Sequence, residues 1–399
     1  MRSLFNSKRI RFLIGLILTC LIVSAAGTVK AAEKEYHIKG MKYYSQENNT
    51  FAALCHNLDV LSELSGVVFD DDSELFGNDD ANDSSNDTKQ YVVSDLGSSV
   101  YDAELYINSG ADGFMICPSS EQVLPEICRM CEEAKVYWGI YYRSIKDEEI
   151  RKLCEDSPYY VGNTYEKEED SAYKLAKAML DYDYHKIAII SEQPWDTTCE
   201  QRERGLQRAI EEAGDVEIVA EIRNMQSIVN VRESIKSLLT AYPELECIYL
   251  VGSKVINAQT EICQIIKEEC GDSDLGLVTF DFSNRLIADF ESGVLKAAYG
   301  LPQMSLDPYY LAIKMVNAVK GFPLEKRSTS HCLSGILIES LEQAVEMADV
   351  IENWDLLFFS EEYIEHNLFK WNNPSLDEES FQRIIDNNIY LENRVLSEK

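Results

Sequence analysis

Residues 186–191 read KIAIIS, a short run with four consecutive apolar residues. Such a run predicts a strand that is buried on both faces of a sheet. Residues 200–213 then show helical spacing of apolar residues and end at Gly214, a residue type that commonly closes helices. The alternation continues through a strand at 216–222, a helix at 228–241, a strand at 247–251, a helix at 254–269 and a strand at 275–282. Strands that alternate with helices in this way indicate a doubly wound α/β fold with a parallel sheet.

The first half of the chain carries the same pattern. Strands are predicted at residues 41–44, 66–69, 111–118 and 136–142, with helical spacing over 51–61, 121–134 and 170–181. A further strand is predicted at 297–299. A chain of 399 residues exceeds the roughly 100–200 residues of one domain, so we expect two lobes of this type.

The charge of the chain excludes some classes of partner. It holds 69 Asp and Glu against 37 Lys and Arg, a formal net charge of −32. Binding to nucleic acid or to anionic membranes needs clustered basic residues, so we expect neither. Residues 70–87 contain eight acidic side chains and no basic one. Their spacing does not match an EF-hand, so a solvated surface loop is favoured over a calcium site.

Residues 1–31 have the layout of a secretory signal peptide. Basic residues precede an apolar run at 12–26, and Val29 and Ala31 supply the small residues of a cleavage site. An uncleaved anchor is one alternative and lipidation at Cys20 is another. No other apolar run is long enough to span a bilayer. We therefore expect an exported protein.

Motifs for catalysis or for a metal are lacking. The sequence contains no GxGxxG, P-loop, GxSxG or HExxH pattern, and its five His residues are scattered. Cys128 and Cys131 form a CxxC on an amphipathic segment, where core packing is favoured over zinc or redox chemistry. Cys55, Cys117 and Cys247 lie within apolar segments in the same way. We expect no cofactor, no metal and no enzymatic activity.

Polar and aromatic residues instead follow the predicted strands, where ligands bind in sheets of this kind. Arg donates paired hydrogen bonds, Asp accepts from hydroxyl groups and rings stack on C–H faces, which suits a small polyhydroxylated ligand. We expect Arg202 and Asp281 to face a cleft, partly hydrated, so that either could be replaced with little loss of stability. The candidate ligand-binding residues are Asn49, Phe51, Arg143, Trp195, Arg202 and Asp281.

Five motifs, in this order, resemble those of a known superfamily. They are ADGFMICP at 111–118, YVGN at 160–163, RERGL at 202–206 with Ala209, VTFD at 278–281 and the segment 293–321. Together they resemble the type I periplasmic sugar-binding proteins, the superfamily of ribose-binding proteins and of the ligand domains of lactose-repressor-like regulators. The resemblance covers about residues 40–345 of this chain.

The resemblance implies two similar doubly wound lobes joined by a three-segment hinge, with crossovers near residues 163, 300 and 328. The N-terminal lobe would comprise residues 38–163 and 301–328, and the C-terminal lobe residues 164–300 and 329–345. Residues 346–399 fall outside the resemblance and are interpreted as an acidic helical appendage. The ligand would bind between the lobes, and the hinge would close on it.

The polar set departs from the family pattern at several positions. The residues that match the pattern are Asn49, Phe51, Arg143, Arg202 and Asp281. The residues that differ from it are Ala52, Tyr142, Gly252, Ser253 and Gly300. The fold is therefore expected to transfer better than the sugar specificity.

Three functions follow from the resemblance. The first is a monomeric solute-binding protein that delivers a small ligand, a monosaccharide in our interpretation, to an ABC transporter permease. The second is a sensor that presents its closed form to a membrane receptor or histidine kinase. The third is an enzyme or scaffold built on the same fold. The predicted signal peptide and the lack of a helix-turn-helix pattern disfavour a repressor.

Overall fold

The computed structural model of the protein describes residues 34–40, 49–71, 98–225, 227–253, 255, 257–271, 274–351, 353 and 355–388. The described residues from Tyr36 onward belong to one compact unit. No helix in this part of the chain is long and apolar enough to cross a membrane. The predicted signal peptide, the strand at 41–44 and nearly all of the acidic segment lie outside the described residues.

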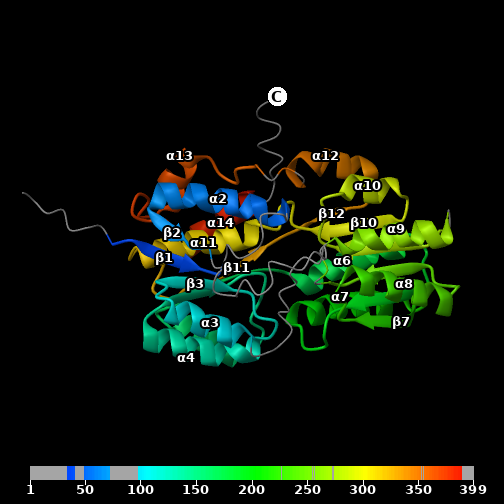
Figure 1. The fold of residues 1–399 in the computed structure, drawn as a ribbon, viewed down its shortest axis with the longest axis horizontal. Helices are drawn as coiled ribbons and strands as arrows, with labels where there is room; N and C mark the ends of the chain where they lie inside the picture. The colour runs from blue at the N-terminus through cyan, green and yellow to red at the C-terminus, as the bar shows by residue number, and fades with distance from the viewer. Residues whose placement is uncertain are drawn as a thin grey trace, which may run out of the picture. The chain divides into compact units, whose positions relative to one another are not determined.

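The first lobe is built on a parallel sheet (Figure 1). Its strands, in spatial order, are β11 (Ser330–Leu333), β5 (Tyr160–Glu166), β4 (Tyr137–Ile140), β3 (Gly113–Ile116), β1 (Tyr36–Lys39) and β2 (Val67–Phe69). One face is covered by α2 (Asn49–Ser65) and α11 (Leu306–Val319). The other face is covered by α3 (Ser98–Asn108), α4 (Leu124–Ala134), which follows the 3₁₀ turn η1 (Glu121–Val123), and α5 (Glu148–Asp156).

The second lobe repeats the design with one antiparallel strand at its edge. Its strands, in spatial order, are β12 (Ile336–Ile338), β10 (Leu295–Gly300), β9 (Gly276–Phe280), β8 (Cys247–Leu250), β6 (Lys186–Ser191) and β7 (Glu217–Arg223). One face is covered by α6 (Glu168–Leu180) and α7 (Thr197–Ala213). The other is covered by α8 (Ile228–Ala241), α9 (Ala258–Cys270), α10 (Leu286–Glu291) and α12 (Leu341–Ile351).

Strand β6 shows why a continuous apolar run is needed. Ile187 and Ile189 pack against α6 and α7, whereas Ala188 and Ile190 pack against the opposite helices. Both faces are buried because side chains alternate along a strand. Gly205 lets α6 and α7 approach closely, since a Cβ there would lie 2.1 Å from a backbone oxygen of α6.

The predicted doubly wound α/β fold with two lobes is confirmed. Strand β6 and helix α8 have the predicted bounds, and Gly214 ends α7 in the left-handed conformation. Helix α9 begins at Ala258 rather than at residue 254, after a left-handed Asn257. Cys128, Cys131 and Cys247 pack in the cores as predicted, while Cys55 and Cys117 are half-buried.

The crossovers differ in part from the predicted positions. The first lies at Lys167, between β5 and α6, and the second follows β10, as expected near residue 300. The third was expected near residue 328, but β11 still pairs with β5 in the first sheet. Since β12 pairs in the second sheet, this crossover lies at residues 334–335.

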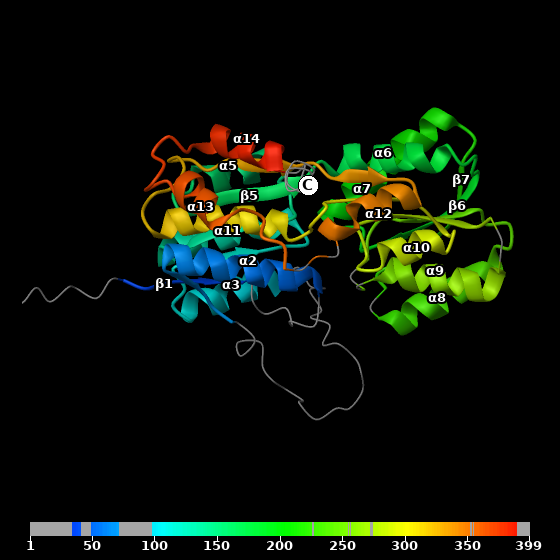
Figure 2. The ribbon, with the colours of Figure 1, turned by 90° about the horizontal axis from the view of Figure 1, so that it is seen from above.

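The prediction of a C-terminal appendage is wrong for the residues that the structure describes. After α12 the chain crosses a fourth time, and residues 356–388 return to the core of the first lobe beside α11 and α2 (Figure 2). This segment contains α13 (Glu361–Tyr363), the π-helical turn η2 (Ile364–Leu368) and α14 (Glu378–Asn388). Its apolar side chains drive the return, because Phe358, Phe369 and Phe381 are almost fully buried there.

Polar groups fix the returning segment in place. Asn57 on α2 donates to the carbonyl of Leu356 and accepts from the amide of Phe358, both at 2.8 Å. Beneath α14, Glu378 Oε2 lies 2.8 Å from Lys314 Nζ and 2.6 Å from His331 Nε2. We call Lys314, His331 and Glu378 the α14 cluster; all three are buried.

Candidate functional site

Residues after the strands of both lobes meet across the lobe boundary, at the carboxyl edges of the two sheets. Arg143, just beyond β4, donates from Nη1 to Thr198 Oγ1 at the start of α7, at 2.6 Å. Its Nη2 lies 3.5 Å from Asp196 Oδ2. Beside it, Gln201 Nε2 donates to Ser144 Oγ at 3.1 Å. The predicted ligand residue Arg143 therefore joins the two lobes directly in this conformation.

Arg202 on α7 is held by partners within the second lobe. Its Nε donates to Glu168 Oε2 at 2.7 Å and its Nη1 donates to the carbonyl of Val251 at 3.1 Å. The same Nη1 lies 3.7 Å from Asp281 Oδ2, and the guanidinium stands 3.9 Å above the centre of the Phe280 ring. The side chain is only 8% exposed. Our expectation of a partly hydrated Arg202 is therefore wrong, because a carboxylate and a ring enclose its charge.

Asp281 fits the expectation of partial hydration better, since its side chain is 35% exposed. It follows β9 with φ at +63°, and Tyr142 follows β4 with φ at +58°. A left-handed residue other than Gly is uncommon and costs free energy, so such residues gather at functional sites. Both strands thus turn sharply at the lobe boundary.

For the other predicted ligand residues, the structure gives less detail. Asn49 and Phe51 lie in the first turn of α2, but their side chains lie outside what the structure describes. Trp195 is half-buried in the turn between β6 and α7. The structure therefore brings together Arg143, Arg202 and Asp281 with the turn that carries Trp195.

Two further carboxylates at the crossovers were missed by the sequence analysis. Glu166, the last residue of β5, is 8% exposed and accepts no hydrogen bond from any residue that the structure describes. Burial first, and then the charge of Glu168, raise the pKa of Glu166 well above its ordinary value. Arg202 opposes this rise, while the charges of Asp281 and Asp307 add to it. The four carboxyl groups are therefore close enough to repel one another.

Asp307 on α11 is the second missed carboxylate, and it is fully buried. Its Oδ1 accepts from Thr164 Oγ1 at 2.6 Å and from the amide of Tyr142 at 2.9 Å. Its Oδ2 has no hydrogen-bond partner among the described residues. Burial raises the pKa of Asp307 to about 7, even though the two hydrogen bonds lower it.

These residues form one group of charges at the base of the lobe boundary. We call it the hinge-root cluster, and its members are Glu166, Glu168, Arg202, Asp281 and Asp307. Four acids stand against one Arg. Among the described residues, no three or more His, Cys, Asp or Glu side chains have an arrangement that could hold a metal ion. With 69 carboxylates in the chain, the only sequence signal for Glu166 and Glu168 was their position just after the YVGN motif.

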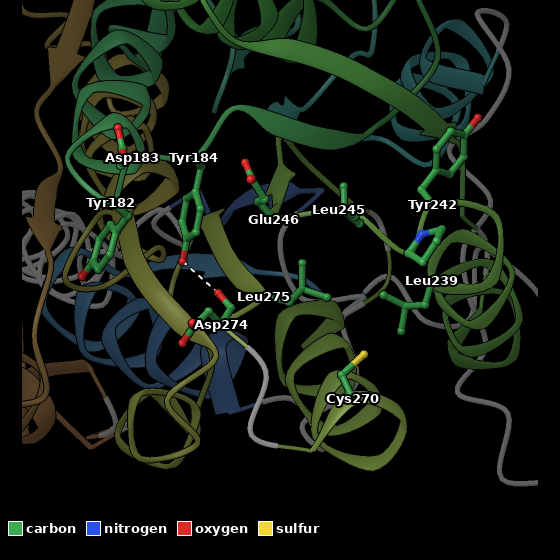
Figure 3. Close-up of a pocket in the computed structure, with 11 residues that line it drawn as sticks. Tyr182, Asp183, Tyr184, Leu239, Tyr242, Leu245, Glu246, Cys270, Asp274 and Leu275 are labelled. Atoms are coloured by element: carbon green, nitrogen blue, oxygen red, sulfur yellow. Dashed lines mark hydrogen bonds between the residues drawn. The ribbon is translucent and has the colours of Figure 1, made fainter.

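A cavity of about 420 Å³ lies elsewhere in the second lobe (Figure 3). Its lining comes from residues just before β6, β8 and β9 and from the ends of α8 and α9, so it opens at the amino edge of the sheet. The rings of Tyr182 and Tyr184 stack there, and the Tyr184 hydroxyl donates to the carbonyl of Asp274. None of the predicted ligand residues lines this cavity, which makes it a useful location for control substitutions.

The fold is similar to those of solved sugar-binding proteins. A galactofuranose-binding protein matches with a TM-score of 0.61 and 12% identity, over 81% of this chain and 100% of its own. A Bacillus halodurans solute-binding protein of an ABC transporter, solved with myo-inositol, matches with a TM-score of 0.60 and 12% identity over the same shares. A periplasmic solute-binding protein from Actinobacillus succinogenes, solved with D-allose, matches with a TM-score of 0.59 and 14% identity. The match covers 79% of this chain and 100% of that protein.

Sequence comparison adds no closer assignment. No family model matches the chain, and no curated protein matches it. The structural likeness establishes the class of fold, which is the two-lobed fold of type I periplasmic binding proteins.

Proposed function

We propose that this protein is an extracytoplasmic solute-binding protein that captures a small polar ligand, a sugar in our interpretation, between its two lobes. One observation carries the proposal: hydrogen-bonding side chains from the carboxyl edges of two separate sheets converge on one boundary. Arg143 and Asp307 come from the first lobe, and Arg202 and Asp281 from the second. Ligands of open α/β sheets bind at this edge. The solved proteins of similar fold have bound sugars and inositol.

Delivery to an ABC transporter permease is the second part of the proposal. Structural neighbours described as ABC transporter components support it. The predicted signal peptide supports export, and in this proposal the protein acts outside the cytoplasm as a monomer. A hinge of several crossing segments would let the lobes open for ligand exchange and close for delivery. The protein would be a carrier rather than an enzyme.

The test is thermal unfolding of the purified protein against a panel of sugars, amino sugars, polyols and nucleosides. A ligand at 100 times its dissociation constant stabilises the folded state by about 2.7 kcal/mol, which raises Tm by several degrees. Asp281→Asn should remove this shift, because Asp281 is the partly exposed carboxylate of the boundary. Asp274→Asn, at the opposite edge of the same sheet, should keep it. No shift with any ligand class in folded protein would refute the proposal.

A further inference from the structure

The hinge-root cluster contains two carboxyl groups that lack a full set of hydrogen-bond partners among the described residues. Glu166 is 8% exposed and accepts no hydrogen bond within the described part of the chain, and Asp307 Oδ2 is fully enclosed and equally unpartnered there. Buried polar groups in folded proteins nearly always have a partner. A buried carboxylate without one is costly, because burial removes its hydration. The carboxyl group of Glu166 and the Oδ2 atom of Asp307 therefore both lack a donor.

The charges around Glu166 do not supply that donor. The groups that face it are Glu168, Asp281, Asp307, Arg202, Tyr299 and Cys332. Arg202 is the only cation among them, and it is already bound to Glu168 and to the carbonyl of Val251. Arg143, a second cation, is bound to Thr198 and lies beside a further acid, Asp196. Lys167, which follows Glu166 in the chain, is exposed. The hinge-root cluster therefore holds more acidic groups than cations.

A ligand with hydroxyl groups alone would satisfy these oxygens only in part. A hydroxyl donates one hydrogen bond and brings no charge, whereas an ammonium donates three and carries a positive charge. Hydrogen bonds between charged partners are roughly twice as strong as neutral ones. The low dielectric of a closed boundary strengthens the attraction further.

We infer that the solute is cationic: a small polar molecule with a protonated amine, such as an amino sugar, whose ammonium binds to Glu166 and to Asp307 Oδ2. The inference rests on the proposed function and names the ligand class of that same site. Asp281, the partly exposed carboxylate, lies on the solvent side of the cluster and would meet the ligand first. Arg202 would position Asp281 and Glu168 rather than bind an anionic group of the ligand.

Binding of an amine should release protons. In the empty protein burial favours the neutral forms of Glu166 and Asp307, whose pKa values are raised. The ammonium needs the ionised forms, so affinity should rise with pH over the range in which the amine itself stays protonated. An amine with a pKa near 8, like that of an α-amino group, allows measurement from pH 5.5 to 7. A neutral sugar should show no such rise.

The experiment is titration calorimetry with matched pairs of ligands: D-glucosamine with D-glucose, and D-galactosamine with D-galactose. N-acetyl-D-glucosamine keeps the nitrogen without its charge, and putrescine keeps amines without the sugar. We expect an amine to bind at least about tenfold more tightly than its neutral partner. The affinity for the amine should rise about tenfold from pH 5.5 to 7. Proton release is measured by comparing the binding enthalpy in two buffers that differ in their ionisation enthalpy.

Substitutions locate the effect. Glu166→Gln should weaken amine binding by about tenfold or more without a comparable loss for a neutral sugar. Asp307→Asn should reduce the proton release, because Glu166 remains as the second group that ionises, and thermal unfolding of both variants reports whether they fold. Asp274→Asn, at the cavity of Figure 3, is the matched control and should change neither property.

The outcomes separate this inference from the proposed function. Tight binding of a neutral sugar with no gain for its amine would overturn the inference and leave the proposed function standing. Binding by neither class, in folded protein, would overturn both. Stabilisation by Ca²⁺ or Mg²⁺ alone, lost in Glu166→Gln, would make the cluster a metal site and overturn the amine assignment.

Discussion

The α14 cluster and the hinge-root cluster both contain buried ionisable side chains, but the partners of their carboxyl groups differ. In the α14 cluster, Glu378 Oε2 receives Lys314 at 2.8 Å and His331 at 2.6 Å. Burial raises the pKa of Glu378, yet these partners hold it below its ordinary value. Glu378 Oε1 has no hydrogen-bond partner among the described residues, so the contrast lies in the bonded cations. In the hinge-root cluster, Glu166 and Asp307 have raised pKa values, and no cation of the described residues forms an ion pair with either.

The difference separates a structural role from a binding role. A buried ion pair with short contacts fixes one arrangement, and here it ties the last described helix to α11 and β11. A buried carboxyl group that no cation neutralises does not stabilise the fold in this way, so another reason is needed for its presence. The proposed ligand supplies that reason. If the comparison is right, the two clusters should respond in opposite ways to substitution and to pH.

The largest expected effect is that of breaking the α14 cluster. Glu378→Ala would leave Lys314, which is 2% exposed, without its counter-charge. Removing one partner of a buried ion pair costs about 3–5 kcal/mol of stability. The free energy of unfolding in urea measures this loss. Glu166→Gln should cost much less, because the side chain of Glu166 has no hydrogen-bond partner among the described residues that would be left behind.

Glu379→Ala is the matched control for that substitution. Glu379 is adjacent on α14, but its side chain is 83% exposed and pairs with Arg383 one turn away. Its loss should leave the urea midpoint nearly unchanged. A Glu378→Ala protein as stable as this control would show that the α14 cluster does not hold the C-terminal segment.

The second effect is on the pH dependence of stability. The pKa of Asp307 is raised from 3.8 to about 7, so the folded protein binds this proton more tightly than the unfolded chain does. Its contribution to stability is therefore complete below about pH 4 and is lost as pH rises to about 7. The slope approaches about 1.4 kcal/mol per pH unit. Comparing the unfolding of wild type and Asp307→Asn at pH 5 and pH 8 isolates this contribution.

The contribution of Glu378 to stability should change with pH in the opposite direction to that of Asp307. Because its pKa is lowered in the folded state, its contribution is present above its ordinary value of 4.5 and is lost as pH falls below it. Asp307→Asn should thus flatten the profile between pH 5 and 8 but keep the acid-induced loss. An unchanged profile in Asp307→Asn would mean that this carboxyl group is ionised in the folded protein.

Much of the fold could be predicted from local patterns. Continuous apolar runs such as 186–191 identify strands buried on both faces, and apolar spacing identifies α8 with its observed bounds. The return of residues 356–388 to the first lobe could not be predicted in this way. The aromatic residues of this segment pack against α2 and α11, which are distant in sequence, and no local period reports such a partner.

The sequence predicted only those site residues that are polar or aromatic and directly follow a predicted strand. Arg143, Arg202 and Asp281 lie together because parallel strands end at one edge. Glu166 and Asp307 carry the stronger signal, but what distinguishes them is burial in the folded protein without an ion-pair partner among the described residues. Among 69 acidic residues, sequence alone gives no measure of that property.

The smallest expected effect concerns Arg143. Unlike the charged groups of the two clusters, Arg143 contacts oxygen atoms of the opposite lobe. Thr198→Val removes the acceptor that lies 2.6 Å from Arg143 Nη1 and keeps the volume of the side chain. Loss of this hydrogen bond should favour the open form by about 1 kcal/mol, or about fivefold in population. Small-angle scattering should then give a larger radius of gyration in the absence of ligand. Thr240→Val, on the exposed face of α8, is the control, and equal radii for both variants would show that Arg143 does not help to close the lobes.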